Sequence, residues 1–137
     1  MTESHPFREM DFPSIPENIN LIESLVEELK KELDLSEELE ANILVSLSEA
    51  VNNAIFHGNH SDPGKSVRLK MNIDPDEIVF IVEDQGVGFN EKDVRDPTSP
   101  ENLDKPTGRG IFLMRNLADH VAFADGGKVV QISFSRR

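Results

Sequence analysis

The chain has 137 residues, of which 29% are charged, and it carries a net charge of −12. This length predicts a single domain with a hydrophobic core, and the absence of cysteine excludes disulfides, a thiol nucleophile and a cysteine-based zinc site. The acidic balance argues against nucleic-acid binding, and no apolar run is long enough for a membrane span or a signal peptide, so we expect a cytoplasmic protein.

The first part of the chain predicts an edge strand followed by an ordinary amphipathic helix. Residues 6–15 are expected to form a short strand that is limited by Pro13. Residues 16–18 then open a helical pattern with an apolar stripe that consists of Ile19, Ile22, Leu25, Val26, Leu29 and Leu33. Glu and Lys cover the rest of this helix, so we expect it to pack on a sheet or on the next helix and to carry no chemistry.

The next helix, residues 36–58, carries an unusual polar stripe. Ser36 is expected to cap its N-terminus and Gly58 to end it. Its apolar face consists of Leu39, Ile43, Leu47, Ala50, Val51, Ala54 and Ile55. Its other face consists of Asn42, Ser46, Glu49, Asn53 and His57, and no Lys or Arg interrupts the helix. The simplest interpretation is a solvent-exposed face without lysine, and the helix alone favours it.

Glu49 and Asn53 give that stripe a second interpretation. They are four residues apart, so a helix places a carboxylate one turn from an amide. Such a pair can hold a hard cation or orient a hydroxyl. The two glycine motifs further along the chain make this interpretation the preferred one.

The polar turn after the helix contains two patterns that we reject as sites. Residues 59–66 resemble a phosphate-binding P-loop, but a true P-loop follows a strand and opens a helix, whereas this stretch follows a helix. His57, His60 and Asp62 suggest a metal site, but no further ligand is in view, so we interpret them as part of a surface loop.

The rest of the chain predicts two strand pairs separated by a long loop and a helix. Residues 67–73 alternate strictly and residues 78–82 are continuously apolar, so they predict a hairpin with a central second strand. Residues 90–107 lack periodicity and contain three prolines, which is typical of a functional or disordered loop. A helix is expected from Gly108 to Leu117, followed by strands at residues 121–123 and 129–134 around an Asp-Gly-Gly turn.

This order of elements, β-α-α-β-β-loop-α-β-β, predicts an α/β fold. We expect one domain that spans residues 1–137. We expect it to be a two-layer sandwich of a mixed, mostly antiparallel sheet with three main helices on one face.

Two short glycine motifs could form a site. DxGxG at residues 84–88 follows a central strand; its acid can accept a hydrogen bond from an amine, and its glycines let the backbone approach a planar ligand. GxG at residues 108–110 opens a helix, where free N–H groups favour an anion such as a phosphate. Each motif is weak alone, and neither is a Rossmann fingerprint.

The set of motifs in this order is more specific than its parts. Residues 49–57 resemble the N box of the GHKL (Bergerat-fold) ATPases, residues 84–88 their G1 box and residues 108–110 their G2 box. The short domain with SEAVNNAIFHG and GRGIFLMRNLAD is similar to the anti-sigma factor serine-protein kinases of that superfamily. The resemblance implies the histidine-kinase-like ATPase fold, ATP and Mg²⁺ as cofactors, and an ATP lid at about residues 90–108.

The resemblance also implies a role for each matching residue. Glu49 would be the general base, Asn53 would bind Mg²⁺, and Asp84 would accept a hydrogen bond from the adenine amine. Helical spacing from Glu49 favours Asn53 over the adjacent Asn52 as the metal ligand. The other implied ATP-binding residues are Gly86, Gly88, Lys105, Thr107, Gly108, Arg109, Gly110 and Ile111.

In function, the resemblance implies an ATP-dependent serine/threonine-protein kinase that acts as an anti-sigma factor in bacterial partner switching. It would bind a sigma factor, phosphorylate a small STAS-type anti-sigma factor antagonist, and form a homodimer through its sheet. The alternative is a nucleotide-gated protein-binding module with little or no kinase activity, in which ATP only orders residues 90–107. A domain without any ligand would require three boxes to coincide in order and context.

Overall fold

The computed structural model describes residues 7–86 and 108–136. Within these two ranges, five strands and three α-helices follow one another in the predicted order. They are β1 (Phe7–Pro13), α1 (Ile19–Leu33), α2 (Glu37–Asn52), β2 (Ser66–Ile73), β3 (Glu77–Glu83), α3 (Gly108–Leu117), β4 (His120–Ala124) and β5 (Val129–Ser135). The described residues also include the short helical segments η1 (Pro16–Asn18), η2 (Asn53–Gly58) and η5 (Asp125–Gly127).

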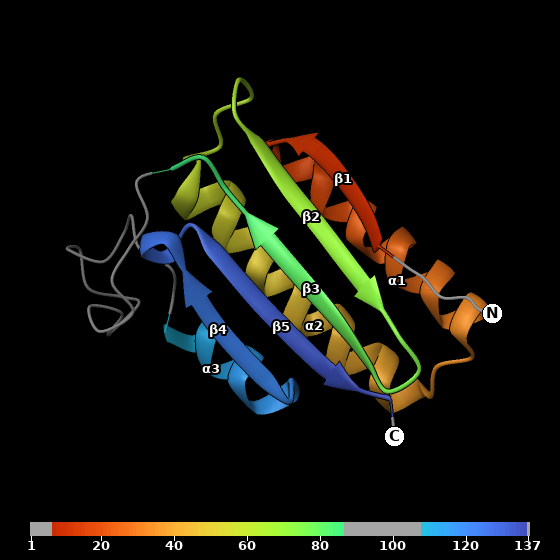
Figure 1. The fold of residues 1–137 in the computed structure, drawn as a ribbon. Helices are drawn as coiled ribbons and strands as arrows, with labels where there is room; N and C mark the ends of the chain where they lie inside the picture. The colour runs from red at the N-terminus through yellow and green to blue at the C-terminus, as the bar shows by residue number, and fades with distance from the viewer. Residues whose placement is uncertain (1–6, 87–107, 137) are drawn as a thin grey trace.

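The strands form one sheet in the order β1-β2-β3-β5-β4. Every strand pairing among the described residues is antiparallel. Figure 1 shows all three α-helices on the same face of this sheet. The expected two-layer α/β sandwich is therefore confirmed, and its described part contains none of the parallel pairs that a mixed sheet would have.

The hydrophobic core lies between the sheet and the helices. Strand β2 alternates exposed and buried residues as its sequence predicted, and β3 is central. Phe80 of β3 and Phe134 of β5 pack edge to face with ring centroids 6.0 Å apart. The other fully buried large side chains come from both layers and are Ile22, Val26, Leu29, Ile43, Leu47, Ile55, Leu69, Ile78, Met114 and Ile132.

The register places both ends of the described chain at the same end of the sheet. Phe7 pairs with Asn72, Asn72 with Val79, and Val79 with Ser133. This row crosses the sheet at the start of β3, whereas Asp84 follows the opposite end of that strand. Figure 1 accordingly shows the start of β1 and the end of β5 far from the end of β3.

Helix α2 begins as predicted but changes its geometry before it ends. The Ser36 hydroxyl accepts a hydrogen bond of 3.1 Å from the backbone N–H of Leu39, which confirms the predicted cap. The α-helix ends at Asn52, and the next six residues form a π-helix, η2. The expectation of one continuous helix to residue 58 is corrected in this respect. The wider turn is completed by the N–H of Asn59, which donates to the carbonyl of Ala54 five residues before it.

Among the described residues, no helix combines the length and the apolar character that a membrane crossing requires.

Candidate functional site

The predicted site residues that the structure describes gather at one end of the sheet. Figure 1 shows the end of η2, the end of β3 and the start of α3 on this side of the molecule. The closest contact joins Gly58 to the loop after β3. A side chain on Gly58 would clash with the carboxyl group of Asp84, and one on Gly86 would overlap the carbonyl oxygen of Gly58. Both positions therefore require glycine for the helix end and the loop to touch.

Glu49 and Asn53 lie one helical turn apart, as the sequence predicted. The backbone N–H of Asn53 donates to the carbonyl of Glu49 at the junction of α2 and η2. Both residues are half-buried, so they lie neither in the core nor fully in solvent. A carboxylate and an amide oxygen are thus presented on the same turn, and hard cations such as Mg²⁺ prefer oxygen ligands of this kind.

Asp84 is held in a fixed orientation at the end of β3. Its Oδ1 accepts a hydrogen bond of 2.8 Å from the backbone N–H of Gly86, and its own N–H donates to the carbonyl of Lys128 at 2.9 Å. Burial raises the pKa of the Asp84 carboxyl, and the bond from Gly86 and the charges of Lys128 and Lys65 oppose this only in part. The Asp84 carboxyl is therefore a half-buried hydrogen-bond acceptor beside Gly58 and Gly86.

The GxG motif opens α3, as predicted. The helix begins at Gly108, so the positive end of the helix dipole lies at the GxG motif, where it favours an anion. Arg109 is exposed, whereas Gly110 and Ile111 are buried. The side chain of Ile111 packs in the core, which leaves its backbone as the part that could contact a ligand.

Three predicted ATP-binding residues, Gly88, Lys105 and Thr107, lie outside the described residues. The predicted lid, apart from Gly108, lies outside them as well.

One further residue beside this site, Asn59, is not predicted from the sequence. Asn59 was grouped with the rejected P-loop pattern, but its side chain is fully buried and bonds to the backbone of Gln85. Its only sequence signal is a polar residue directly after the glycine that ends a helix, and many surface turns share that signal.

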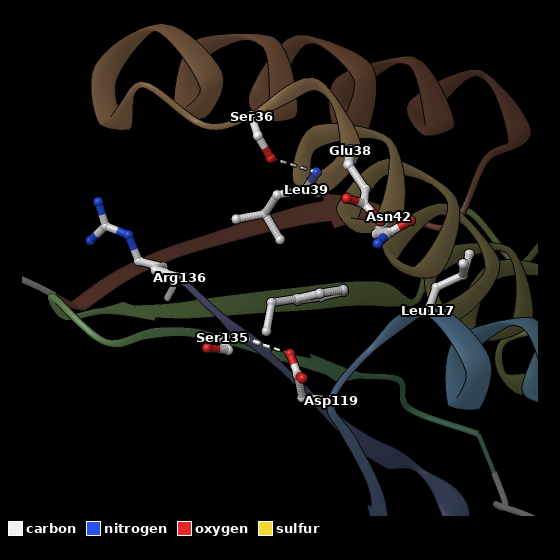
Figure 2. Close-up of a pocket in the computed structure, with 9 residues that line it drawn as sticks. Ser36, Glu38, Leu39, Asn42, Leu117, Asp119, Ser135 and Arg136 are labelled. Atoms are coloured by element: carbon white, nitrogen blue, oxygen red, sulfur yellow. Dashed lines mark hydrogen bonds between the residues drawn. The ribbon is translucent and has the colours of Figure 1, made fainter.

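A hollow of about 370 Å³ lies at the other end of α2, away from these residues. Figure 2 shows how the start of α2, the end of α3 and the end of β5 surround it. Asp119 accepts a hydrogen bond of 2.6 Å from the N–H of Ser135, and Arg136 donates to the carbonyl of Asp74. The residues that line the hollow are Ser36, Glu38, Leu39, Asn42, Leu117, Asp119, Phe134, Ser135 and Arg136. None of them is a predicted catalytic or ATP-binding residue.

Comparison with known proteins matches most of the chain to the ATPase superfamily that its motifs resemble. The family model of the histidine kinase-like ATPase domain matches residues 12–134. An anti-sigma F factor from Oceanobacillus iheyensis is 33% identical over 113 aligned positions, and the match covers 80% of this chain and 77% of that protein. An anti-sigma F factor from Clostridium perfringens is 31% identical over 132 aligned positions, and the match covers 93% of this chain and 94% of that protein. The serine-protein kinase RsbW of Bacillus licheniformis is 28% identical over 140 aligned positions, and the match covers 97% of this chain and 88% of that protein.

A solved structure supports the fold independently. The RsbU and RsbW domains of a Mycobacterium tuberculosis protein match with a TM-score of 0.66 at 14% sequence identity. The match covers 97% of this chain and 32% of that one, and at this identity it indicates a shared fold. Together with the match over residues 12–134, these findings show that the chain belongs to the histidine kinase-like ATPase domain family, in which the anti-sigma F factors and RsbW serine-protein kinases are its relatives.

Proposed function

We propose that this protein is an ATP-dependent serine/threonine-protein kinase that acts as an anti-sigma factor. It would bind a sigma factor and phosphorylate a STAS-type anti-sigma factor antagonist. Its relatives named as anti-sigma F factors and serine-protein kinases support both activities. The single observation that carries the proposal is the pair of Glu49 and Asn53 on one helical turn, at the same end of the sheet as the Asp84 loop.

The nucleotide would lie between the helix end and the loop after β3. The half-buried carboxyl of Asp84, oriented by the N–H of Gly86, is suited to accept a hydrogen bond from the adenine amine. Gly58 and Gly86 let the helix end and the loop pack directly against each other, because a side chain on either glycine would overlap the other segment. We propose Gly88 as part of the same surface.

The phosphates would lie at the start of α3. The backbone N–H groups of Gly108, Arg109, Gly110 and Ile111 belong to its first turn, where the helix dipole favours negative charge. We propose that Lys105 and Thr107 complete this binding surface.

The same turn of α2 would hold the metal and the base. The side-chain oxygen of Asn53 would bind Mg²⁺, which when bound neutralises charge on the triphosphate. Glu49 would accept the proton from the hydroxyl of the protein substrate as that oxygen bonds to the γ-phosphorus. The bond from that phosphorus to the bridging oxygen of ADP then breaks, and ADP leaves with the electron pair.

The open face of the sheet supports a homodimer. Val79 and Ile81 of β3 alternate with core residues and therefore point away from the helices. Phe7, in the same row of the sheet as Val79, is 61% exposed. We propose that two copies associate through this face in the cytoplasm, which sedimentation of the purified protein would test.

Glu49→Gln tests the central assignment, because it keeps the size and removes the base. The variant should bind Mg-ATP normally in calorimetry, while phosphate transfer to a purified STAS-type antagonist falls by about 100-fold or more. Glu40→Gln, in the first turn of the same helix, should transfer phosphate normally.

Unchanged transfer by Glu49→Gln would show that the base is assigned wrongly. A wild-type protein that binds Mg-ATP but transfers phosphate to no antagonist would instead favour the nucleotide-gated binding module.

A further inference from the structure

The turn after η2 buries an amide side chain that joins three distant segments. Asn59 has no exposed area. Its Nδ2 donates to the hydroxyl of Ser14 at 2.7 Å and to the carbonyl of Ser66 at 3.0 Å. Its Oδ1 accepts a hydrogen bond of 2.7 Å from the N–H of Gln85. Both its donor hydrogens and its acceptor oxygen are used, as a buried amide requires.

Two further hydrogen bonds brace the same group. The side-chain oxygen of Gln85 accepts from the N–H of Ser66 at 2.6 Å. The hydroxyl of Ser14 donates to the carbonyl of Lys65 at 2.7 Å. Gln85 is therefore held through its backbone by Asn59 and through its side chain by the start of β2.

The position of Gln85 gives these bonds their importance. It lies between Asp84 and Gly86, which form the loop that touches Gly58. Asn59 directly follows Gly58 at the end of η2. Gly58 thus contacts the Asp84–Gly86 loop, and Asn59 holds the same loop by a hydrogen bond from Gln85.

We infer that Asn59 is a positioning residue for nucleotide binding. Its buried amide holds the Asp84–Gly86 loop against the end of the helix that carries Glu49 and Asn53. Because Asn59 has no exposed area, it acts through Gln85 and does not touch the nucleotide. The inference rests on the proposed function, which assigns Asp84 to the adenine.

A purely structural role would have a different consequence. Loss of the amide leaves the N–H of Gln85 and the carbonyl of Ser66 without their partner. A buried polar group without a hydrogen-bond partner destabilises the folded state. If Asn59 only stabilised the fold, its loss would lower stability and leave the affinity for ATP unchanged. If it positions the loop, ATP has to reorder that loop when it binds, so the affinity falls as well.

Asn59→Ala and Ser14→Ala form a matched pair. Both lose a buried hydrogen bond of this network, but only Asn59→Ala loses the bond to Gln85. We expect Asn59→Ala to raise the Kd for Mg-ATP about tenfold, as the loss of one such bond implies. Ser14→Ala should stay within about twofold of wild type even where its melting temperature falls. At saturating ATP, Asn59→Ala should transfer phosphate at nearly the wild-type rate, so that KM rises and kcat does not.

Equal affinities for wild type and Asn59→Ala would overturn the inference, and so would equal losses in both variants. A wild-type protein that fails to bind Mg-ATP would overturn the proposed function first and this inference with it.

Hydrogen exchange of the wild-type protein provides a test that needs no variant. Without nucleotide, the amide of Gln85 should exchange as slowly as the paired amides of β3, because Asn59 already holds it. Exchange of Gln85 at an unprotected rate would show that the loop is not held in place before ATP binds.

Discussion

Burial raises the pKa of the Asp84 carboxyl, and this has a consequence for stability as well as for binding. A carboxyl with a raised pKa binds more protons in the folded state than in the unfolded state. Stability therefore falls as pH rises from the ordinary pKa of an aspartate through the raised value. Above that raised pKa the folded protein carries this cost in full, which is expected where a charged group is retained for a ligand.

Asp84→Asn should separate these two effects. The amide keeps the acceptor for the N–H of Gly86 and removes the half-buried charge, so the melting temperature at pH 7 should rise above that of wild type. The difference should disappear at a pH below the ordinary pKa of an aspartate. Glu23→Gln, at an exposed position of α1, removes the same charge from the total and should leave the melting temperature nearly unchanged. A melting temperature that falls at pH 7 would contradict this account.

At the scale of single residues, part of the candidate site could be predicted from the sequence. The turn that joins Glu49 to Asn53 follows from helical periodicity, and the roles of these residues remain predictions. The contact between Gly58 and Asp84 and the bond from Gln85 to Asn59 join positions 26 residues apart. They depend on how β3 lies beside η2, which no local pattern specifies.

At the scale of single elements, the start of α2 is better specified by sequence than its end. Ser36 has the side chain and the spacing of an N-cap, and the structure confirms the bond to Leu39. Over six residues, by contrast, an apolar stripe cannot distinguish an α-helix from a π-helix, because the two periods diverge too little. The widened turn η2 begins at Asn53, so it affects the angle at which the predicted metal ligand is presented.

Ser36→Ala should lower the free energy of unfolding by about 1 kcal/mol, the usual cost of a lost N-cap. Urea denaturation would measure it. Ser24→Ala, at an exposed position within α1, removes the same hydroxyl without a cap and should cost nothing or stabilise slightly. An equal loss in both variants would mean that the Ser36 hydroxyl contributes no specific bond.

At the scale of the whole molecule, the sequence predicted the layers but not the order of the strands. Alternation in residues 67–73 and the apolar run in residues 78–82 indicated how each strand is buried. The position of β5 between β3 and β4 is a matter of tertiary pairing, since a hairpin can present either of its strands to the sheet. In agreement with its position inside the sheet, β5 is more buried than the edge strand β4.

Because the candidate site joins η2, β3 and α3, its ligand should stabilise the entire domain. Mg-ATP at about 100 times its Kd should raise the free energy of unfolding by about 2.7 kcal/mol if it binds only the folded state. Thermal unfolding with and without nucleotide would measure this. Mg-GTP at the same concentration should give a smaller gain, because guanine carries a carbonyl oxygen at the position where adenine carries the 6-amino group that Asp84 is proposed to bind. Equal gains from both nucleotides would remove adenine recognition from the account.

The row of the sheet that joins Phe7 to Ser133 leaves room for attachments at both ends of the chain. An affinity tag or a fluorescent protein joined directly before Phe7 or after Arg136 would be attached at the end of the sheet remote from Asp84 and should not obstruct ligand entry. The same layout is compatible with such a domain being one module of a larger polypeptide, and the match covers 32% of the Mycobacterium tuberculosis chain, which holds RsbU and RsbW domains.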